Sequence, residues 1–184
     1  PLDDLEVRII RITDDAIEEW SDALIIPDGE IGEIAVKGAN ATREYFNRES
    51  STRLAKIADP VGDGEFWHRM GDVGYLDERG RLWMCGRKSH RVIVGGETLF
   101  TIPCEAIFDN HPKVFRSALI GVDAEGEIKP VICVELEQDD RGVNQESLRA
   151  ELLELGSGSE LTKGIKTVLF HPKFPVDIRH NAKI

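Results

Sequence analysis

Short apolar stretches separated by turn residues run through the first half of the chain. Their alternation of apolar and polar positions predicts strands, because successive side chains of a strand point to opposite faces. We expect strands at 5–12, 33–37, 66–69, 73–76 and 81–85. Asp77-Glu-Arg-Gly80 predicts a hairpin turn before the last of them, with glycine near the position that needs a positive φ.

Two segments of the first half carry other patterns. Residues 47–58 predict a helix, with Leu54 and Ile57 three residues apart and Ser50 or Ser51 helping to begin it. Residues 14–20 predict a short helix or a turn, and 27–32 are dense in turn residues. The first half is therefore predicted to be strand-rich, with one helix.

The second half alternates strands with helices. Pro103 is placed to start a helix that ends near 111–112. A second helix at 144–155 has Asn144 as candidate cap and places three leucines on one stripe, before a flexible loop at 156–159. Strands are predicted at 91–94, 98–102, 114–122, 131–136 and 165–170, and the stripe leucines are Leu148, Leu152 and Leu155. This pattern is typical of a small α+β domain whose helices pack on a short sheet.

A charged segment, 86–91, interrupts the apolar pattern between the halves. We place the domain boundary there, between a β-rich subdomain, 1–86, and a small C-terminal domain, 87–184. The predicted fold class is α+β. The chain begins at Pro1 without a Met, so we expect it to be part of a longer protein.

Composition narrows the function classes. The 184 residues are 41% hydrophobic and carry a formal net charge of -11, which disfavours nucleic acid or an anionic membrane as partner. No apolar run approaches the ~20 residues that span a bilayer. Three cysteines, Cys85, Cys104 and Cys133, lie far apart among apolar neighbours, which predicts core packing and fits a reducing cytoplasm. The histidines are scattered, so we expect no protein-held metal.

Three polar residues are candidates for chemistry, each with an ordinary alternative. Asp72 could accept hydrogen bonds from a vicinal diol such as ribose, or bond to its own turn. Arg87 could bind phosphate or ribose oxygens through its fork of donors, or be a solvated charge. Lys183 could meet developing negative charge on a phosphoryl or acyl oxygen, or be a solvated terminal lysine. The glycine pairs at 95–96 and 156–158 match no phosphate-loop pattern.

Four motifs in order give these residues a context. Gly32-Glu-Ile-Ala-Val-Lys-Gly38 with Tyr45 resembles the GE-strand-G-Y motif of the adenylate-forming enzymes. Arg69-Met-Gly-Asp72, with Asp77 and Gly80, resembles their (R/T)-x-G-D…D-x-x-G segment. The segment from Gly86-Arg87 through Gly96 to Glu105 resembles their hinge motif, and residues 175–184 resemble their late lysine motif.

The resemblance implies a mechanism. A large preceding domain binds ATP, Mg²⁺ and a carboxylic acid, and the acid attacks the α-phosphate to form an acyl-adenylate. By this analogy Asp72 holds the ribose hydroxyls, Arg87 contacts the nucleotide, and Lys183 stabilises the adenylation transition state. The small domain then turns about a hinge at Arg87, Lys88 and Ser89, which is a gating step.

Departures from the common pattern point to one branch. Ser89 stands where the hinge residue is often Asp or Lys, and Ile93 where several members carry lysine. The tail 174–184 and the segments 82–88 and 130–136 resemble the β-lactone synthetases of bacterial long-chain olefin biosynthesis. In that branch the hydroxyl of an activated β-hydroxy acid closes the ring as AMP leaves.

Two other hypotheses stay open. A fatty acyl-CoA ligase would share the fold and the adenylation step but give a thioester. A non-catalytic module that docks onto partner enzymes, such as others of olefin biosynthesis, belongs to a different class. We expect the chain alone to be inactive and to bind ATP weakly.

Overall fold

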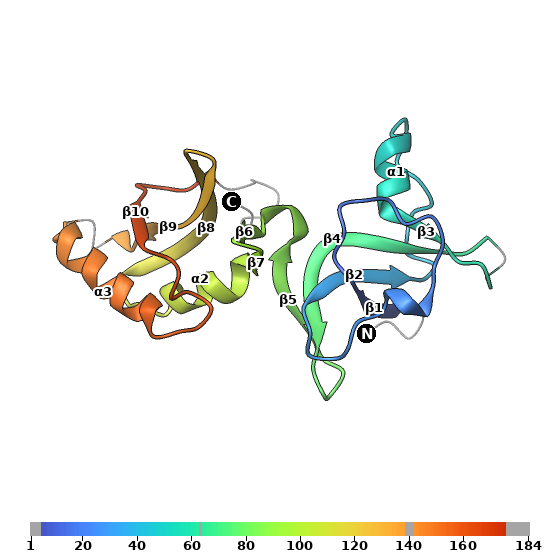
Figure 1. Ribbon diagram of the computed structural model, residues 1–184, viewed down its shortest axis with the longest axis horizontal. Helices are drawn as coiled ribbons and strands as arrows, with labels where there is room; N and C mark the ends of the chain where they lie inside the picture. Colours follow the sequence, from blue (N-terminus) through green and yellow to red (C-terminus); the bar gives the residue numbers. More distant parts are fainter. Residues whose placement is uncertain (1–4, 63, 139–141, 176–184) are drawn as a thin grey trace. The chain divides into compact units, whose positions relative to one another are not determined.

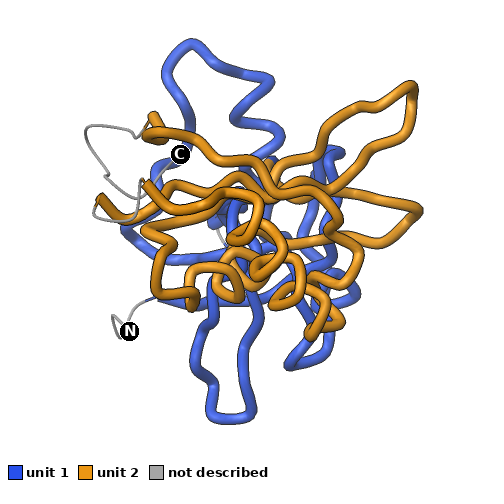
Figure 2. The backbone as a smooth tube through the Cα atoms, turned by 90° about the vertical axis from the view of Figure 1, so that its left-hand side faces the viewer, with its two compact units in different colours: residues 1–89 blue, residues 90–184 orange. Residues whose placement is uncertain are grey.

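The computed structural model describes residues 5–62, 64–138 and 142–175. It divides into two compact units, Pro1–Ser89 and His90–Ile184 (Figure 2). The first is strand-rich, and the second packs two helices on a three-stranded sheet (Figure 1). This is the predicted α+β class.

The first unit is built on one antiparallel sheet of order β1-β2-β4-β3, with β5 also pairing β4. Its core includes Ile10, Ala35 and Ile57, together with Trp20 and Trp67, whose rings stack at 4.1 Å. The elements are β1 Glu6–Ile10, the 3-10 helix η1 Asp22–Leu24, β2 Gly32–Lys37, α1 Glu49–Ala55, β3 Lys56–Ala58, β4 Phe66–Leu76 and β5 Leu82–Arg87.

Two predictions for this unit are wrong, and a third is decided between its alternatives. The two strands expected at 66–69 and 73–76 are one strand, β4, because a bulge carries the ladder past residues 70–72. The helix expected at 47–58 ends at Ala55, because Lys56–Ala58 pairs with β4 instead, and neither serine caps it; its N-cap is Arg48. Of the short helix or turn predicted at 14–20, the structure has no helix: the chain bends at 14–15, where the Asp15 amide donates to Thr13 Oγ1, and Glu19 then bridges Ala58.

The second unit has a sheet of order β10-β9-β8 and a separate hairpin of β6 and β7. The η2 turn, Lys88–His90, leads from the first unit into the second. The elements are β6 Val92–Val94, β7 Glu97–Leu99, α2 Thr101–Asp109, β8 Val114–Ala124, β9 Glu127–Leu136, α3 Gln145–Ser157 and β10 Thr167–Phe170. Pro103 lies in the first turn of α2, and Asn144 caps α3 by accepting from the amides of Glu146 and Ser147.

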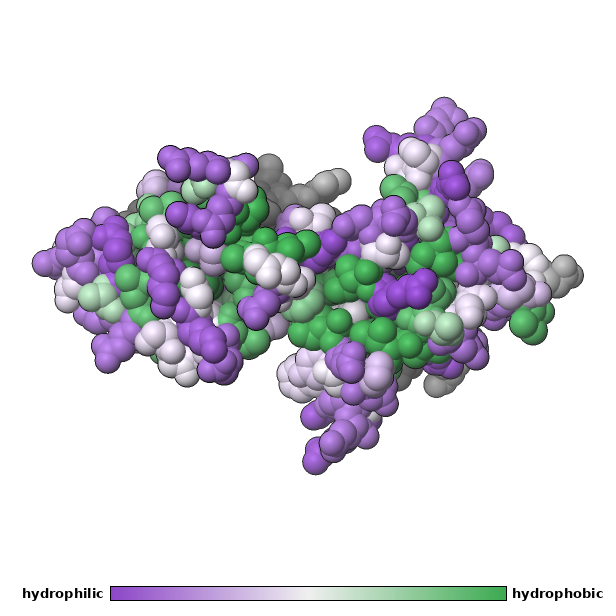
Figure 3. Space-filling model, in the orientation of Figure 1, coloured by the Kyte–Doolittle hydropathy of each residue, from purple (hydrophilic) through white to green (hydrophobic). Residues whose placement is uncertain are grey.

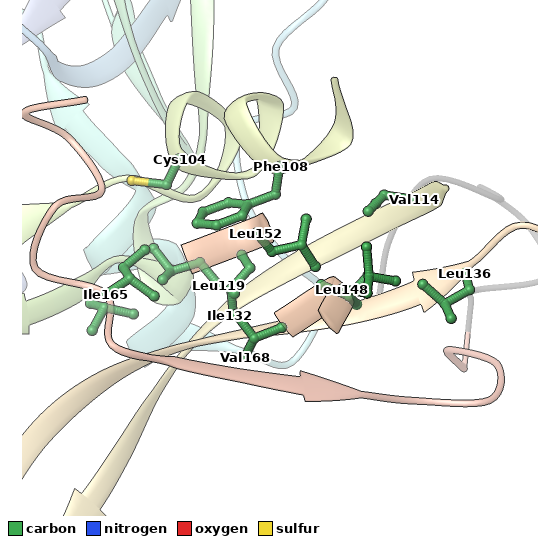
Figure 4. Close-up of a cluster of buried hydrophobic side chains, with 12 residues drawn as sticks. Cys104, Phe108, Val114, Leu119, Ile132, Leu136, Leu148, Leu152, Ile165 and Val168 are labelled. Carbon is green, nitrogen blue, oxygen red and sulfur yellow. The ribbon is translucent and has the colours of Figure 1, made fainter. Parts of the chain in front are cut away.

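One core joins the helices to the sheet. Figure 4 shows Phe108 of α2 and Leu152 of α3 reaching toward Leu119 and Ile132 of the sheet, and all four are buried. Two details differ from prediction. Leu155 is exposed, so the leucine stripe is narrower, and Gly156 lies in α3 rather than in a flexible loop.

Apolar residues also reach the surface of both units (Figure 3). Leu82, Trp83 and Met84 of β5 are all half-exposed, and among the described strands β5 pairs with β4 alone. The predicted cysteine packing is confirmed for Cys85 and Cys104, which are buried, while Cys133 is partly buried. Within the described ranges, no helix is long and apolar enough to cross a membrane.

Candidate functional site

Asp72 and Arg87, two of the predicted site residues, lie side by side on neighbouring strands. The β4–β5 ladder pairs Asp72 with Arg87. Their side chains form an ion pair, with Asp72 Oδ1 2.8 Å from Arg87 Nη1. Arg87 Nη1 also lies 3.4 Å from the carbonyl oxygen of Met70, a long hydrogen bond. The fold thus brings together two residues fifteen positions apart in the sequence.

Two irregularities frame this pair. Between the pairs Glu33–Val73 and Ala35–Arg69, β2 has one residue where β4 has three, so residues 70–72 bulge from the ladder. Gly71, inside the bulge, has φ 68°, which favours glycine. The β4–β5 ladder shifts register next to Asp72 as well. Such bulges re-aim side chains and are frequent beside active sites.

The hairpin that sets the β4–β5 register is held by Asp77. Its carboxylate accepts hydrogen bonds from the Trp83 indole at 2.9 Å and from the Arg81 side chain at 2.7 Å. It also accepts from the backbone amides of Arg79 and Arg81. The bond from Trp83, followed by those from Arg81, holds the pKa of Asp77 well below its ordinary value. This carboxylate therefore shapes the turn that aligns Asp72 with Arg87.

The pair suits a nucleotide chemically. The Asp72 side chain keeps 17% of its surface exposed and Arg87 34%, so part of each side chain reaches the surface. Asp72 Oδ1 itself is shielded, and among the described residues it accepts no well-aligned hydrogen bond. A carboxylate accepts two hydrogen bonds from a vicinal diol, and an arginine with spare donors binds phosphate or ribose oxygens. The residues present therefore fit the ribose side of ATP.

A buried ionic cluster lies in the same unit. Glu33 on β2 and Arg69 on β4 are almost fully buried and pair at 2.6 Å. Arg69 also donates to the carbonyl oxygens of Thr13 at 2.5 Å and Asp15 at 2.7 Å. Lys88 places Nζ 3.1 Å from Glu33 Oε1 and 3.0 Å from the Thr13 carbonyl oxygen. The cluster ties β2, β4 and the segment before η1 to the residue that follows β5.

Lys88 thereby gains a role that sequence reasoning missed. We predicted Arg87, Lys88 and Ser89 as hinge residues, without partners for them. The structure shows Lys88 held by Glu33, a residue of the GE motif, while Ser89 is the last residue of the first unit. Two hints of this buried cluster are present in the sequence. Glu33 is an acidic residue at the start of an apolar strand, and Arg69 follows the ring-bearing residues 66–68.

Lys183 lies outside the described residues, so its predicted catalytic position stays a prediction. Among the residues that are described, no group of three or more His, Cys, Asp or Glu is arranged as metal ligands would be.

Comparison with known proteins yields close relatives. An olefin beta-lactone synthetase of Xanthomonas campestris pv. campestris is 49% identical over 181 residues, which are 97% of this chain and 33% of that protein. An olefin beta-lactone synthetase of Stenotrophomonas maltophilia is 48% identical over 183 residues, 97% of this chain and 32% of the relative. The chain thus spans about a third of the length of these curated relatives. No family model matches it.

Solved structures share the fold. The O-succinylbenzoate coenzyme A synthetase of Bacillus subtilis, in complex with ATP and magnesium ion, aligns with a TM-score of 0.74 at 27% identity. The alignment covers 100% of this chain and 33% of that one.

Proposed function

Because this chain belongs to the adenylate-forming superfamily, as its C-terminal part, we propose that it completes an ATP-dependent enzyme that converts a β-hydroxy carboxylic acid into a β-lactone. The observation that carries the proposal is the 49% identity to an olefin beta-lactone synthetase along 97% of the chain. The Asp72–Arg87 pair supports it, because the pair offers the acceptors and donors that a nucleotide needs.

The first step of the proposed reaction is adenylation. A carboxylate oxygen of the acid attacks the α-phosphorus of ATP, and pyrophosphate leaves. We assign Asp72 to the ribose hydroxyls and Arg87 to the nucleotide, and Lys183 to the negative charge that develops on the reacting oxygens. Mg²⁺, which the family implies, is assigned to the part of the enzyme that precedes this chain.

The second step is ring closure. The β-hydroxyl oxygen attacks the acyl carbon, the proton of the hydroxyl is lost, and AMP leaves as the ring closes. The nucleophile and the electrophile belong to one molecule, which gives a large effective molarity, so coenzyme A has no part in the reaction. Between the steps, the C-terminal domain would turn about the hinge at Arg87, Lys88 and Ser89 and carry Lys183 away.

The test uses the full-length protein that carries this chain. Incubated with ATP, Mg²⁺ and a β-hydroxy fatty acid, it should release AMP and pyrophosphate and form a β-lactone that mass spectrometry detects. Product formation without coenzyme A supports the proposal. A strict requirement for coenzyme A would overturn it.

An acyl-CoA ligase is the second candidate, favoured by the shared fold with the O-succinylbenzoate coenzyme A synthetase. The same incubation decides between them when coenzyme A is added. A ligase would convert the acid into a thioester that hydroxylamine traps, whereas the proposed synthetase gives the same lactone at the same rate.

Site variants test the residue assignments. Asp72→Asn removes a charged acceptor and should raise the KM for ATP about tenfold or more in pyrophosphate exchange. Asp28→Asn is the matched control, because Asp28 is an exposed aspartate in a turn of the same unit. Lys183→Ala should abolish most of the exchange. Unchanged exchange in Lys183→Ala would remove the catalytic assignment of that lysine.

A further inference from the structure

Glu135 is a buried carboxylate on the face of the second unit's sheet that the helices do not cover. Its neighbour on β9, Val134, belongs to the core between sheet and helices. Side chains alternate along a strand, so Glu135 points to the opposite face. It is 4% exposed. A buried carboxylate is costly unless hydrogen bonds compensate it, so its partners show what it does there.

Two partners come from different elements. Arg116, the register partner of Glu135 on β8, donates from Nε to Glu135 Oε2 at 2.9 Å. The same oxygen accepts a hydrogen bond from the backbone amide of Phe174, also at 2.9 Å. Phe174 follows β10, so this bond joins β9 to the segment that leads out of the sheet.

That segment is held at further points. The His171 amide continues the β10–β9 pairing by donating to the carbonyl oxygen of Val134 at 2.8 Å. The rings of His171 and Phe174 stack with centroids 5.4 Å apart, and Phe174 is 6% exposed. The chain therefore turns after β10 and is fastened again at Phe174. Of these contacts, only the bond to Glu135 is charge-assisted.

We propose that Glu135 is a positioning residue for adenylation, which fixes the origin of the tail that carries Lys183. The inference rests on the proposed function, in which Lys183 serves the adenylation step. Lys183 follows Phe174 by nine positions, so it can lie at most about 30 Å from that point. Holding Phe174 sets where the tail starts. Without this bond, the entropic cost of ordering the tail would be added to the activation free energy of adenylation.

Arg116 completes the device. Its guanidinium compensates the Glu135 charge from the neighbouring strand and lies 4.9 Å above the ring of Phe115. The guanidinium thus lies against the same carboxylate oxygen that the Phe174 amide meets. An apolar residue at 135 would suit a strand equally well but would offer the tail no acceptor.

The structural arm of the test measures amide exchange in the 184-residue chain. Glu135→Gln should speed exchange of the Phe174 amide about tenfold, since a neutral acceptor replaces a charged one. Glu137→Gln is the control, because Glu137 is an exposed glutamate just past the same strand. The double variant Arg116→Leu, Glu135→Val removes both charges together, which keeps the strands apolar and the fold intact. In it, Phe174 should exchange faster still. Unchanged protection of the Phe174 amide in the double variant would refute the hypothesis that Glu135 holds this segment.

The functional arm uses the full-length enzyme. Both variants should lower kcat of pyrophosphate exchange about tenfold, with little change in the KM for ATP or in lactone formation from a supplied acyl-adenylate. An equal loss in both half-reactions would indicate a general structural defect and refute a positioning role. Lys183→Ala separates the two hypotheses. If it abolishes exchange while the Glu135 variants do not affect it, the inference fails and the proposed function stands. If Lys183→Ala has no effect on exchange, the proposed role of Lys183 is wrong, and the inference that rests on it fails as well.

Discussion

Arg69→Met tests whether the buried ionic cluster holds the first unit together. The Arg69 side chain is 2% exposed and lies against Glu33 Oε2 at 2.6 Å. It also donates to three backbone carbonyl oxygens, those of Thr13, Asp15 and Leu54. Methionine keeps an unbranched apolar stem like that of arginine but lacks the guanidinium and therefore has no donor. The substitution therefore leaves a buried carboxylate and three carbonyls without this partner.

The structure sets the size of the effect. Removing one member of a buried ion pair costs about 3–5 kcal/mol. Lys88 remains 3.1 Å from Glu33 and continues to compensate the carboxylate, so we expect the lower end of that range. For a domain of this size, each kcal/mol lowers the unfolding midpoint by roughly 4–8 °C. A loss near 3 kcal/mol should therefore lower the midpoint by more than about 10 °C.

Tryptophan fluorescence reports on this unit alone, because Trp20, Trp67 and Trp83 all lie in it. Thermal and urea unfolding of the 184-residue chain are thus the assays. Arg53→Met is the matched control: Arg53 pairs with Glu18 at 2.6 Å, but the two side chains are 70% and 67% exposed. Exposed pairs contribute about 1 kcal/mol or less. Equal midpoints for the two variants would refute the stabilising role of the cluster.

Three further predictions concern packing, pH and ligand. Gly156→Ala should destabilise the second unit by about 1–3 kcal/mol, because an added Cβ would lie 2.8 Å from the Phe108 ring. Amide exchange of α3 measures the loss, with Gly164→Ala as control, since nothing lies within 4 Å of a Cβ there. Burial, and then the nearby Lys56 charge, lower the pKa of His68 in the folded protein. As pH falls, His68 therefore binds a proton in the unfolded chain at a higher pH than in the folded one, which favours unfolding. The first unit should lose stability below about pH 6.5, and His68→Gln should flatten that fluorescence profile; an unchanged slope would exclude His68 as the cause. Calorimetry should show ATP binding by the chain alone to be weaker than micromolar, whereas micromolar affinity would contradict a site completed by the preceding part.

Local patterns predicted much of the fold because they act over a few residues. The hairpin at Asp77–Gly80 formed as expected, since its turn chemistry lies within four positions. Helix α3 formed behind its Asn144 cap for the same reason. The order of the motifs also predicted the superfamily, which the relatives confirm.

Other predictions failed where distant pairing overrode a local signal. We predicted two strands, at 66–69 and 73–76, but β2 pairs on both sides of residues 70–72 and makes β4 continuous through a bulge. The helical pattern at 47–58 was cut short because Lys56–Ala58 gains a strand partner in β4. The helix propensity of a few residues is weaker than the hydrogen bonds and packing that a paired strand gains.

The sequence by itself determined most of the strands, turns and helices, and it identified Asp72 and Arg87 as candidates. Only the tertiary structure decided that these two face each other, that Glu33 holds Arg69 and Lys88, and that Glu135 meets Phe174. The physical reason is range. Periodicity and capping are written in neighbouring residues, whereas strand register and the burial of a charge depend on partners far away along the chain.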